Sequence, residues 1–128
     1  MRTILFSTIA LLSGLCAFAQ SNPGLNNLTE CSVYAPTAFT PNRDNTNDEF
    51  RVVISEYCDP VEFHLYVYDR YGRLVFESID PLQGWDGRYD GKSLKEGVYM
   101  WHVLARYTIP SGDKSPAIDR KGSVVMLR

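Results

Sequence analysis

Apolar and polar side chains alternate along Val61–Tyr68, and this period of two constrains the fold more than any other feature of the chain. The apolar side chains share one side of the extended backbone: Val61, Phe63, Leu65 and Val67. The side chains between them are polar or amphipathic. Such a pattern is typical of a β-strand with one face on a core and the other toward solvent. Helical signals are absent, so we expect an all-β fold.

Short apolar runs recur at intervals of about ten residues, separated by turn residues, which predicts an antiparallel β-sandwich. We expect strands over Val33–Phe39, Phe50–Ser55, Val61–Tyr68, Leu74–Ser78, Val98–Tyr107 and Ser123–Leu127. Pro36 interrupts the first run, which favours a sheet edge for that strand. Val98–Tyr107 is expected to be a central strand. The Gly- and Asp-rich segment Gly84–Gly91 and the polar segment Pro110–Pro116 are expected to be loops.

The length of 128 residues leaves room for one ordinary domain. The hydrophobic content of 45% is enough to fill a core, so the chain should fold. The net charge is −2, and the longest basic run is the pair Arg120-Lys121. Nucleic-acid binders carry a basic surface, and the sequence therefore excludes nucleic acid as the expected partner.

The first 19 residues have the pattern of a cleaved secretory signal peptide. Arg2 is the cationic start, Ile4–Leu15 is apolar, and Ala17–Ala19 is the small-x-small site before Gln20. The apolar run is too short to span a bilayer, which needs about 20 residues. Leu15 disfavours lipidation of Cys16. We expect residues 1–19 to be removed, residues 20–30 to form a flexible lead-in and residues 31–128 to form a domain that is not an integral membrane protein.

Cys31 and Cys58 remain after that cleavage, in an oxidising compartment. An even number of cysteines in a small secreted domain favours a disulfide, which would stabilise the fold by roughly 3 kcal/mol. Two buried free thiols are the alternative. A catalytic thiol is disfavoured because neither cysteine has a basic neighbour in the sequence.

The chain offers no set of residues expected of an enzyme. His64 and His102 stand without a nucleophile or a cysteine at ligand spacing, and the acids are scattered. Each histidine is typical of a surface or an interface, and zinc is not expected. The sequence therefore predicts a non-enzymatic protein without a required cofactor.

Oxygen-bearing side chains recur at every second position from residue 42 to residue 48: Asn42, Asp44, Thr46 and Asp48. Loops that bind Ca²⁺ use such a spacing, and Asp44 and Asp48 are the candidate ligands. Asn47 and Val53, however, occupy the positions where an EF-hand-like loop has glycine and a bidentate glutamate. A loop of Asx turns, with side chains capping their own backbone, is the favoured alternative.

Two groups of aromatic residues have both a structural and a binding interpretation. Trp85-Asp86-Gly87 is interpreted as a turn, with Trp85 on the edge of the sandwich and Asp86 fixing the turn. A carbohydrate could stack on exposed aromatic residues, although strand aromatics more often pack against neighbours. The candidates for such stacking are Tyr66, Tyr68, Trp101 and Tyr107.

Four ordered segments resemble the gliding-motility-associated C-terminal domain, the type B sorting domain of the type IX secretion system. The similar segments are Tyr34–Phe50, where the family pattern is PNAFTPNGDGxND-x-F, Val67–Ser78, where it has an RWG turn, Gly84–Gly87 together with Gly97–Tyr99, and the tail Gly122–Arg128. The resemblance covers Cys31–Arg128. The chain departs from the pattern at Thr37, at Arg43 and Asn45, which replace glycines, and at Tyr71, which replaces tryptophan. Arg43 puts the geometry of its loop in question, because glycine tolerates positive φ and arginine does not.

The resemblance implies an immunoglobulin-like β-sandwich of about seven strands that directs transport across the outer membrane to the cell surface or the extracellular medium. Its implied partners are the type IX translocon and an outer-membrane barrel of the PorP/SprF kind, in gliding motility or surface adhesion. The implied recognition and fold residues are Arg70, Gly72, Trp85, Asp86, Gly87, Leu127 and Arg128. The alternatives are a calcium-dependent or carbohydrate-binding surface module and, third, a scaffold in an outer-membrane assembly.

Overall fold

The computed structural model describes residues 31–55, 58, 60–109, 111–115 and 117–128. The predicted signal peptide, the lead-in and Cys16 lie outside these residues. The described part of the chain contains nine strands and no helix, which confirms the all-β prediction. It accordingly holds no helical segment that could cross a membrane.

Five strands form the main sheet, in the order β2-β9-β8-β4-β5. Their bounds are Ala38–Phe39 for β2, Pro60–Tyr68 for β4, Leu74–Ser78 for β5, Gly97–Tyr107 for β8 and Ile118–Met126 for β9. The long strand β8 is central, as predicted. Two smaller two-stranded sheets pair β1 (Val33–Tyr34) with β3 (Val53–Ile54) and β6 (Arg88–Tyr89) with β7 (Lys92–Ser93).

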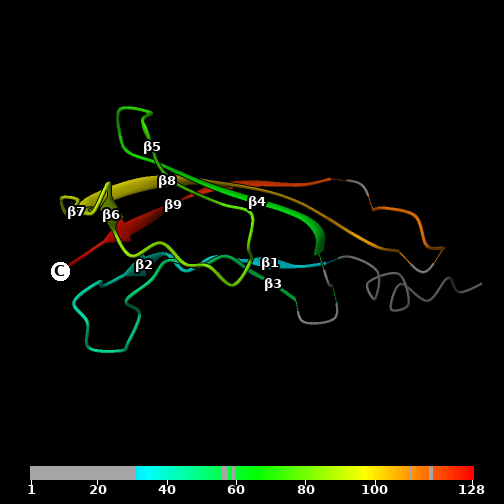
Figure 1. The fold of residues 1–128 in the computed structure, drawn as a ribbon, viewed down its shortest axis with the longest axis horizontal. Coiled ribbons are helices and arrows are strands. Elements are labelled where there is room, and N and C mark those ends of the chain that lie inside the picture. Colours follow the sequence, from blue (N-terminus) through cyan, green and yellow to red (C-terminus); the bar gives the residue numbers. More distant parts are fainter. Residues whose placement is uncertain (1–30, 56–57, 59, 110, 116) are drawn as a thin grey trace, which may run out of the picture.

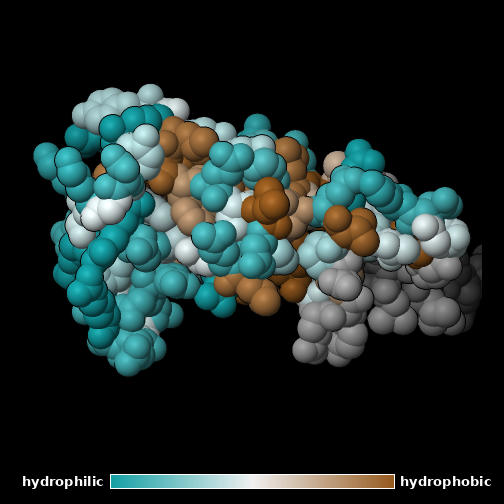
Figure 2. All heavy atoms as spheres, viewed as in Figure 1, coloured by the Kyte–Doolittle hydropathy of each residue, from teal (hydrophilic) through white to brown (hydrophobic). Residues whose placement is uncertain are grey.

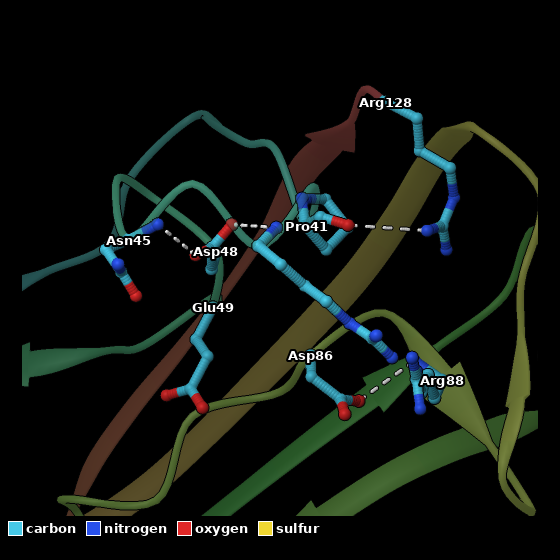
Figure 3. Close-up of a pocket in the computed structure, with 8 residues that line it drawn as sticks. Pro41, Asn45, Asp48, Glu49, Asp86, Arg88 and Arg128 are labelled. Atoms are coloured by element: carbon cyan, nitrogen blue, oxygen red, sulfur yellow. Dashed lines mark hydrogen bonds between the residues drawn. The ribbon is translucent and has the colours of Figure 1, made fainter.

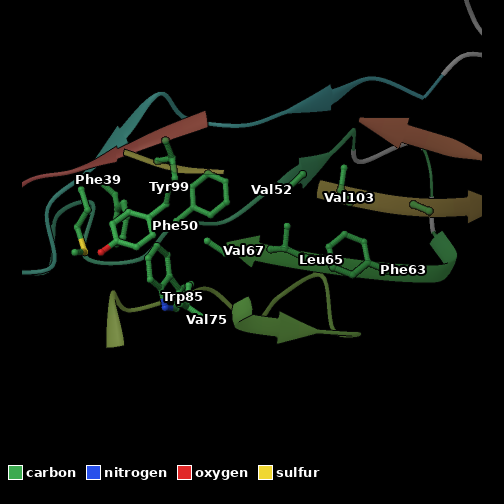
Figure 4. Packing of buried hydrophobic residues seen from close by; sticks show 13 residues of the cluster. Phe39, Phe50, Val52, Phe63, Leu65, Val67, Val75, Trp85, Tyr99 and Val103 are labelled. Atoms are coloured by element: carbon green, nitrogen blue, oxygen red, sulfur yellow. The ribbon is translucent and has the colours of Figure 1, made fainter. Parts of the chain in front are cut away.

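The molecule has two layers. Figure 1 shows β1 and β3 beneath the long strands of the main sheet, with the C-terminus at one end of the molecule. Aromatic and aliphatic side chains from both layers fill the space between them (Figure 4). Apolar burial between two layers is the main stabilising term of such a fold.

The predicted first strand, Val33–Phe39, is divided in two. The main chain leaves the small sheet after β1, passes Pro36 and joins the main sheet as β2. Proline has no N–H group to give to a sheet, which accounts for the division at that point. β2 lies at a sheet edge, as predicted, but it pairs with β9 in parallel. The expectation of a wholly antiparallel sandwich is therefore wrong at this edge.

Three further boundaries differ from the prediction. Of Phe50–Ser55 only β3 is a strand, because Phe50 instead exchanges backbone hydrogen bonds with Trp85. The predicted loop Gly84–Gly91 includes β6, which turns back into β7 at Asp90-Gly91, both with positive φ. The last strand begins at Ile118 rather than Ser123, because its charged first half also pairs with β8 although its side chains are exposed.

Strand β4 buries three of its four predicted core side chains. Phe63, Leu65 and Val67 are buried, but Val61 is 51% exposed. The pairing of β4 with β8 shifts register between Pro60 and Glu62, which turns Val61 away from the core.

Trp85 lies in the centre of the aromatic core. Its side chain is fully buried, with ring centroids 5.4 Å from Phe39 and 4.9 Å from Tyr99. The indole Nε1 donates to the carbonyl oxygen of Arg88 at 2.9 Å. The prediction that Trp85 lies on the edge of the sandwich is therefore wrong, because the segment after β5 folds across the sheet and carries the indole inward.

Trp101 also faces the core, against the prediction that it is exposed. On β8 it shares a face with the buried Tyr99 and Val103, and its ring lies 6.3 Å from that of Phe50. Gly122 on β9 lies directly opposite. A Cβ atom at Gly122 would come within 2.5–2.9 Å of the indole, so glycine provides the space that the tryptophan ring occupies.

The predicted disulfide joins Cys31 and Cys58 in the structure, with Cα atoms 5.9 Å apart. It ties the segment before β1 to the segment before β4, and the two cysteines are 27 residues apart. A closed loop of this size stabilises a small domain by roughly 3 kcal/mol in the chain-entropy account.

We predict that Gly122→Ala destabilises the domain by about 1–3 kcal/mol, the usual cost of overpacking a core. The added methyl group must displace the Trp101 indole. Urea unfolding followed by tryptophan fluorescence measures the effect. Ser123→Ala, at the next and exposed position of β9, is the matched control and should change stability by less than about 0.5 kcal/mol. Equal stability of the two variants would contradict the packing account.

Candidate recognition site

Three of the four sequence segments that carry the resemblance meet at the end of the molecule that holds the C-terminus. They surround a cavity of about 300 Å³. Its lining comes from the 41–49 loop, from the turn after Trp85 and from the tail: Pro41, Arg43, Asn45, Asp48, Glu49, Asp86, Arg88 and Arg128 (Figure 3). Figure 2 shows hydrophilic side chains gathered over this end on the face in view. Residues far apart in sequence thus form one polar surface.

The carboxylate of Asp48 organises the 41–49 loop. Its Oδ1 accepts backbone N–H bonds from Asn42 at 3.1 Å and Arg43 at 2.8 Å, and its Oδ2 accepts from Asn45 at 2.7 Å. Asp44 Oδ1 accepts in addition from the backbone N–H of Thr46 at 2.9 Å. This is the predicted loop of Asx turns, in which side chains take the place of a backbone ladder.

The loop keeps the left-handed backbone that glycine would favour. Arg43 has φ of 62° and Asn45 has φ of 64°, and these are the two positions where the family pattern has glycine. Left-handed backbone costs a non-glycine residue about 1–2 kcal/mol, less for asparagine. Arg43 therefore adopts the conformation expected of glycine, because the hydrogen bonds to Asp48 hold the loop backbone against that strain.

Calcium binding by Asp44 and Asp48 stays a prediction. Both oxygens of Asp48 already accept backbone hydrogen bonds, so a cation would compete with the groups that hold the loop. Among the described residues, no three His, Cys, Asp or Glu side chains come together in a group suited to a metal ion.

Arg128 braces the site from the tail. Its guanidinium donates to the carbonyl oxygens of Leu94 at 3.1 Å and of Pro41 and Gly87 at 3.5 Å. Its backbone N–H donates to Glu96 Oε1 at 2.5 Å. The backbone N–H of Leu127 extends the β2–β9 pairing by donating to Phe39 at 3.0 Å. The tail therefore links segments that are otherwise distant in the chain.

Gly87 is the point of closest contact among those segments. It has φ of 78° and is buried. A Cβ atom there would lie 2.6 Å from Met126 Sδ and 3.1 Å from Pro41 Cγ. The preceding Asp86 accepts the backbone N–H of Arg88 at 3.1 Å, which fixes the turn as predicted. The GWDG segment thus needs glycine at this position for both conformation and space.

Arg70 and Gly72 lie apart from the cavity, in the β4–β5 hairpin turn. Arg70 lies over the exposed ring of Tyr71 at 4.9 Å, and Gly72 has φ of 80° with open space around it. Asp69 shapes the turn by accepting backbone N–H bonds from Tyr71 and Arg73, both at 2.9 Å. The hairpin therefore presents an arginine and an aromatic ring to solvent, separate from the pocket.

The Asp69 carboxyl has a pKa below its ordinary value. Burial raises this pKa, but the backbone N–H groups of Arg73 and Tyr71 and the charge of Arg73 lower it by more. Stability from this turn is therefore present above the ordinary pKa of an aspartate and is lost as the pH falls through the lowered value.

The residues proposed for sugar stacking do not form one exposed platform. Trp101 is partly buried and packs against the core. Tyr66 and Tyr68 are half-buried on the outer face of β4, and Tyr66 stacks on His64 at 4.1 Å. Tyr107 is half-buried at the far end of β8. The expectation of four exposed aromatic residues is wrong.

The two histidines lie on that same outer face and pair across strands with acids. His64 Nε2 is 2.6 Å from Glu77 Oε1, and His102 Nε2 is 2.7 Å from Asp119 Oδ1. This is the surface placement expected from the sequence.

Sequence reasoning did not single out Glu49 or Arg88, which line the cavity. Arg88 directly follows the GWDG segment, and Glu49 follows Asp48. Both residues lie within or next to the segments that resemble the family. Neither occupies a position at which the family pattern specifies a residue type.

We predict that Gly87→Ala destabilises the domain by about 2–4 kcal/mol, because left-handed strain adds to overpacking against Met126 and Pro41. Gly91→Ala is the matched control. Gly91 has φ of 74° with nothing within 4 Å of a Cβ atom, so only the strain of about 1–2 kcal/mol applies. Thermal and urea unfolding measure both variants, and an equal loss would contradict the close contact at Gly87.

We predict that Asp48→Ala lowers stability by about 1–2 kcal/mol, because three backbone N–H groups lose their acceptor. Asp44→Ala, which removes one such bond, should have the smaller effect. Thermal melts in CaCl₂ and in EDTA test the metal at the same time. We expect equal melting temperatures in the two buffers, whereas a rise in calcium that Asp48→Ala abolishes would establish a calcium site.

Comparison with known families agrees with the motifs that meet at this site. The model of the CHU_C Type IX secretion signal domain matches residues 33–125, which is more than half of the chain. A search of curated proteins found no match, and a search of solved structures found none either. The matched range runs from β1 into β9 and so spans both layers of the sandwich. The chain belongs to the family of CHU_C type IX secretion signal domains.

Proposed function

We propose that this domain is a non-enzymatic export signal that is read in its folded form at the outer membrane and that delivers the protein to the cell surface or beyond it. The family match carries a sorting role in type IX secretion. The observation that supports reading of the folded form is the cavity, because its lining residues come together only when the sandwich has formed.

The partners in this proposal are the type IX translocon and an outer-membrane barrel of the PorP/SprF kind, in gliding motility or surface adhesion. The surface offered to them is the end with the cavity and the β4–β5 hairpin. At the tip of the hairpin, Arg70 and Tyr71 are exposed and do not pack against the core. The role of Gly87, Trp85 and Arg128 in this proposal is structural, because their contacts fix the positions of the segments that line the cavity.

The site supports a role in binding rather than in catalysis. Its carboxylates accept backbone hydrogen bonds or pair with arginine, as Glu49 does with Arg51 at 2.8 Å. Neither histidine lines the cavity. A polar surface held by its own backbone contacts is suited to docking.

The decisive experiment is fractionation of the native host beside a type IX secretion mutant, with an antibody that detects this protein in the periplasm, outer membrane and medium. We expect periplasmic retention in the mutant alone. A chain that lacks Leu127 and Arg128 should also be retained, because the brace across Pro41, Gly87 and Leu94 is lost.

Ser123→Ala, on the exposed face of β9, is the control for that truncation and should be exported normally. Protease resistance of the retained truncated chain separates loss of recognition from loss of folding. An unchanged distribution of the wild-type protein in the secretion mutant would contradict the sorting role.

A further inference from the structure

Two arginines in the cavity have no partner of their own. Arg43 and Arg88 line it, and within the described residues neither guanidinium makes an ion pair or donates a hydrogen bond. Four other arginines have partners: Arg51 with Glu49, Arg73 with Asp69, Arg106 with Glu62 and Arg128 with three carbonyl oxygens. A guanidinium binds a carboxylate through two parallel hydrogen bonds. The cavity therefore holds unused capacity for an anionic group.

The carboxylates of the cavity wall do not use that capacity. Asp48 is turned to three backbone N–H groups and Glu49 to Arg51. Asp86 accepts one backbone N–H bond through Oδ1 and makes no ion pair with a described residue. The wall thus combines two free guanidinium groups with a carboxylate that has an oxygen left to accept a donor.

This mixture favours one class of ligand. A small free anion would meet the guanidinium groups but also the negative charge of Asp48, Glu49 and Asp86. A peptide with acidic side chains supplies both partners, a carboxylate for the arginines and backbone N–H groups for Asp86. A volume of about 300 Å³ is several times that of one small ion, since a water molecule takes about 30 Å³ of liquid.

We propose that the cavity binds an acidic segment of a partner protein, with Arg43 and Arg88 holding a carboxylate side chain. This inference rests on the proposed function, because it names the chemistry by which the partner reads the folded domain. Arg128 is a positioning residue here, since its guanidinium holds the loops and not the ligand. The binding is electrostatic in part and therefore weakens as salt is added.

The test measures binding of a fluorescein-labelled peptide, Gly-Glu-Ser-Glu-Gly-Asp-Ser-Gly, to the full mature chain by fluorescence anisotropy at low salt. The competitor peptide has glutamine and asparagine in place of the acids. Arg43→Gln with Arg88→Gln removes both free guanidinium groups while leaving their backbone contacts. The matched control is Arg120→Gln with Lys121→Gln, two exposed positions of β9 outside the cavity, which changes the net charge by the same amount.

We expect the Arg43/Arg88 double variant to bind the acidic peptide at least tenfold more weakly, and the control double variant to bind it as the wild type does. The neutral peptide should not compete. Absent binding to the wild type, or equal losses in the two double variants, would overturn the inference. Inorganic phosphate that displaces the peptide at equal concentration would also overturn it, because the cavity would then be a simple anion site.

The fractionation experiment keeps the two proposals apart. If the wild-type protein depends on type IX secretion but the peptide does not bind, the acidic-segment inference fails and the sorting role stands. If the wild-type protein is distributed as in the secretion mutant, the sorting role fails whatever the peptide does.

Discussion

The burial of Trp85 holds the rest of this small domain together. The indole packs against Phe39 from β2 and Tyr99 from β8, and its Nε1 binds the carbonyl oxygen of Arg88. Its backbone pairs with Phe50 in both directions, at 2.8 and 2.9 Å. One residue thus joins the edge strand, the central strand and the two irregular segments that cover the sheet. Buried aromatic area dominates the energetics of so small a core, and here the same residue also places the turn that lines the cavity.

The position of Trp85 also determines the geometry of the cavity. Two residues after Trp85 the chain reaches Gly87, where Met126 and Pro41 approach too closely for a side chain. The same contact brings the tail to the 41–49 loop, and Arg128 secures it through backbone carbonyl oxygens. The disulfide lies next to the start of β4, where it ties the first segment of the domain to the main sheet. The disulfide and the cavity therefore lie in different parts of the same short chain.

Sequence reasoning predicted the parts of the fold that depend on periodicity and missed those that depend on long-range contact. The alternation in β4, the length of β8 and the cysteine pair each carry a local or compositional signal, and all three are present in the structure. The parallel pairing of β2 with β9 has no such signal, because β2 is only two residues long and its partner lies at the other end of the chain. Trp101 was expected to be exposed, although alternation places it on the face of Tyr99 and Val103, and the space for its ring comes from Gly122, which is distant in the sequence.

The candidate site shows the same division between local and distant information. The Asx loop was predictable, because Asp48 and its neighbours act within six residues of one another, and the left-handed positions were marked by a departure from glycine. The cavity was not predictable, since Arg43, Arg88 and Arg128 meet only through tertiary packing. A linear tail motif would be read equally well in an unfolded chain, but a surface assembled from three distant segments is present only after the sandwich closes. Under the proposed function, a partner that binds this surface selects folded protein. The left-handed backbone at Arg43 then places the arginine side chain where the proposed acidic segment binds.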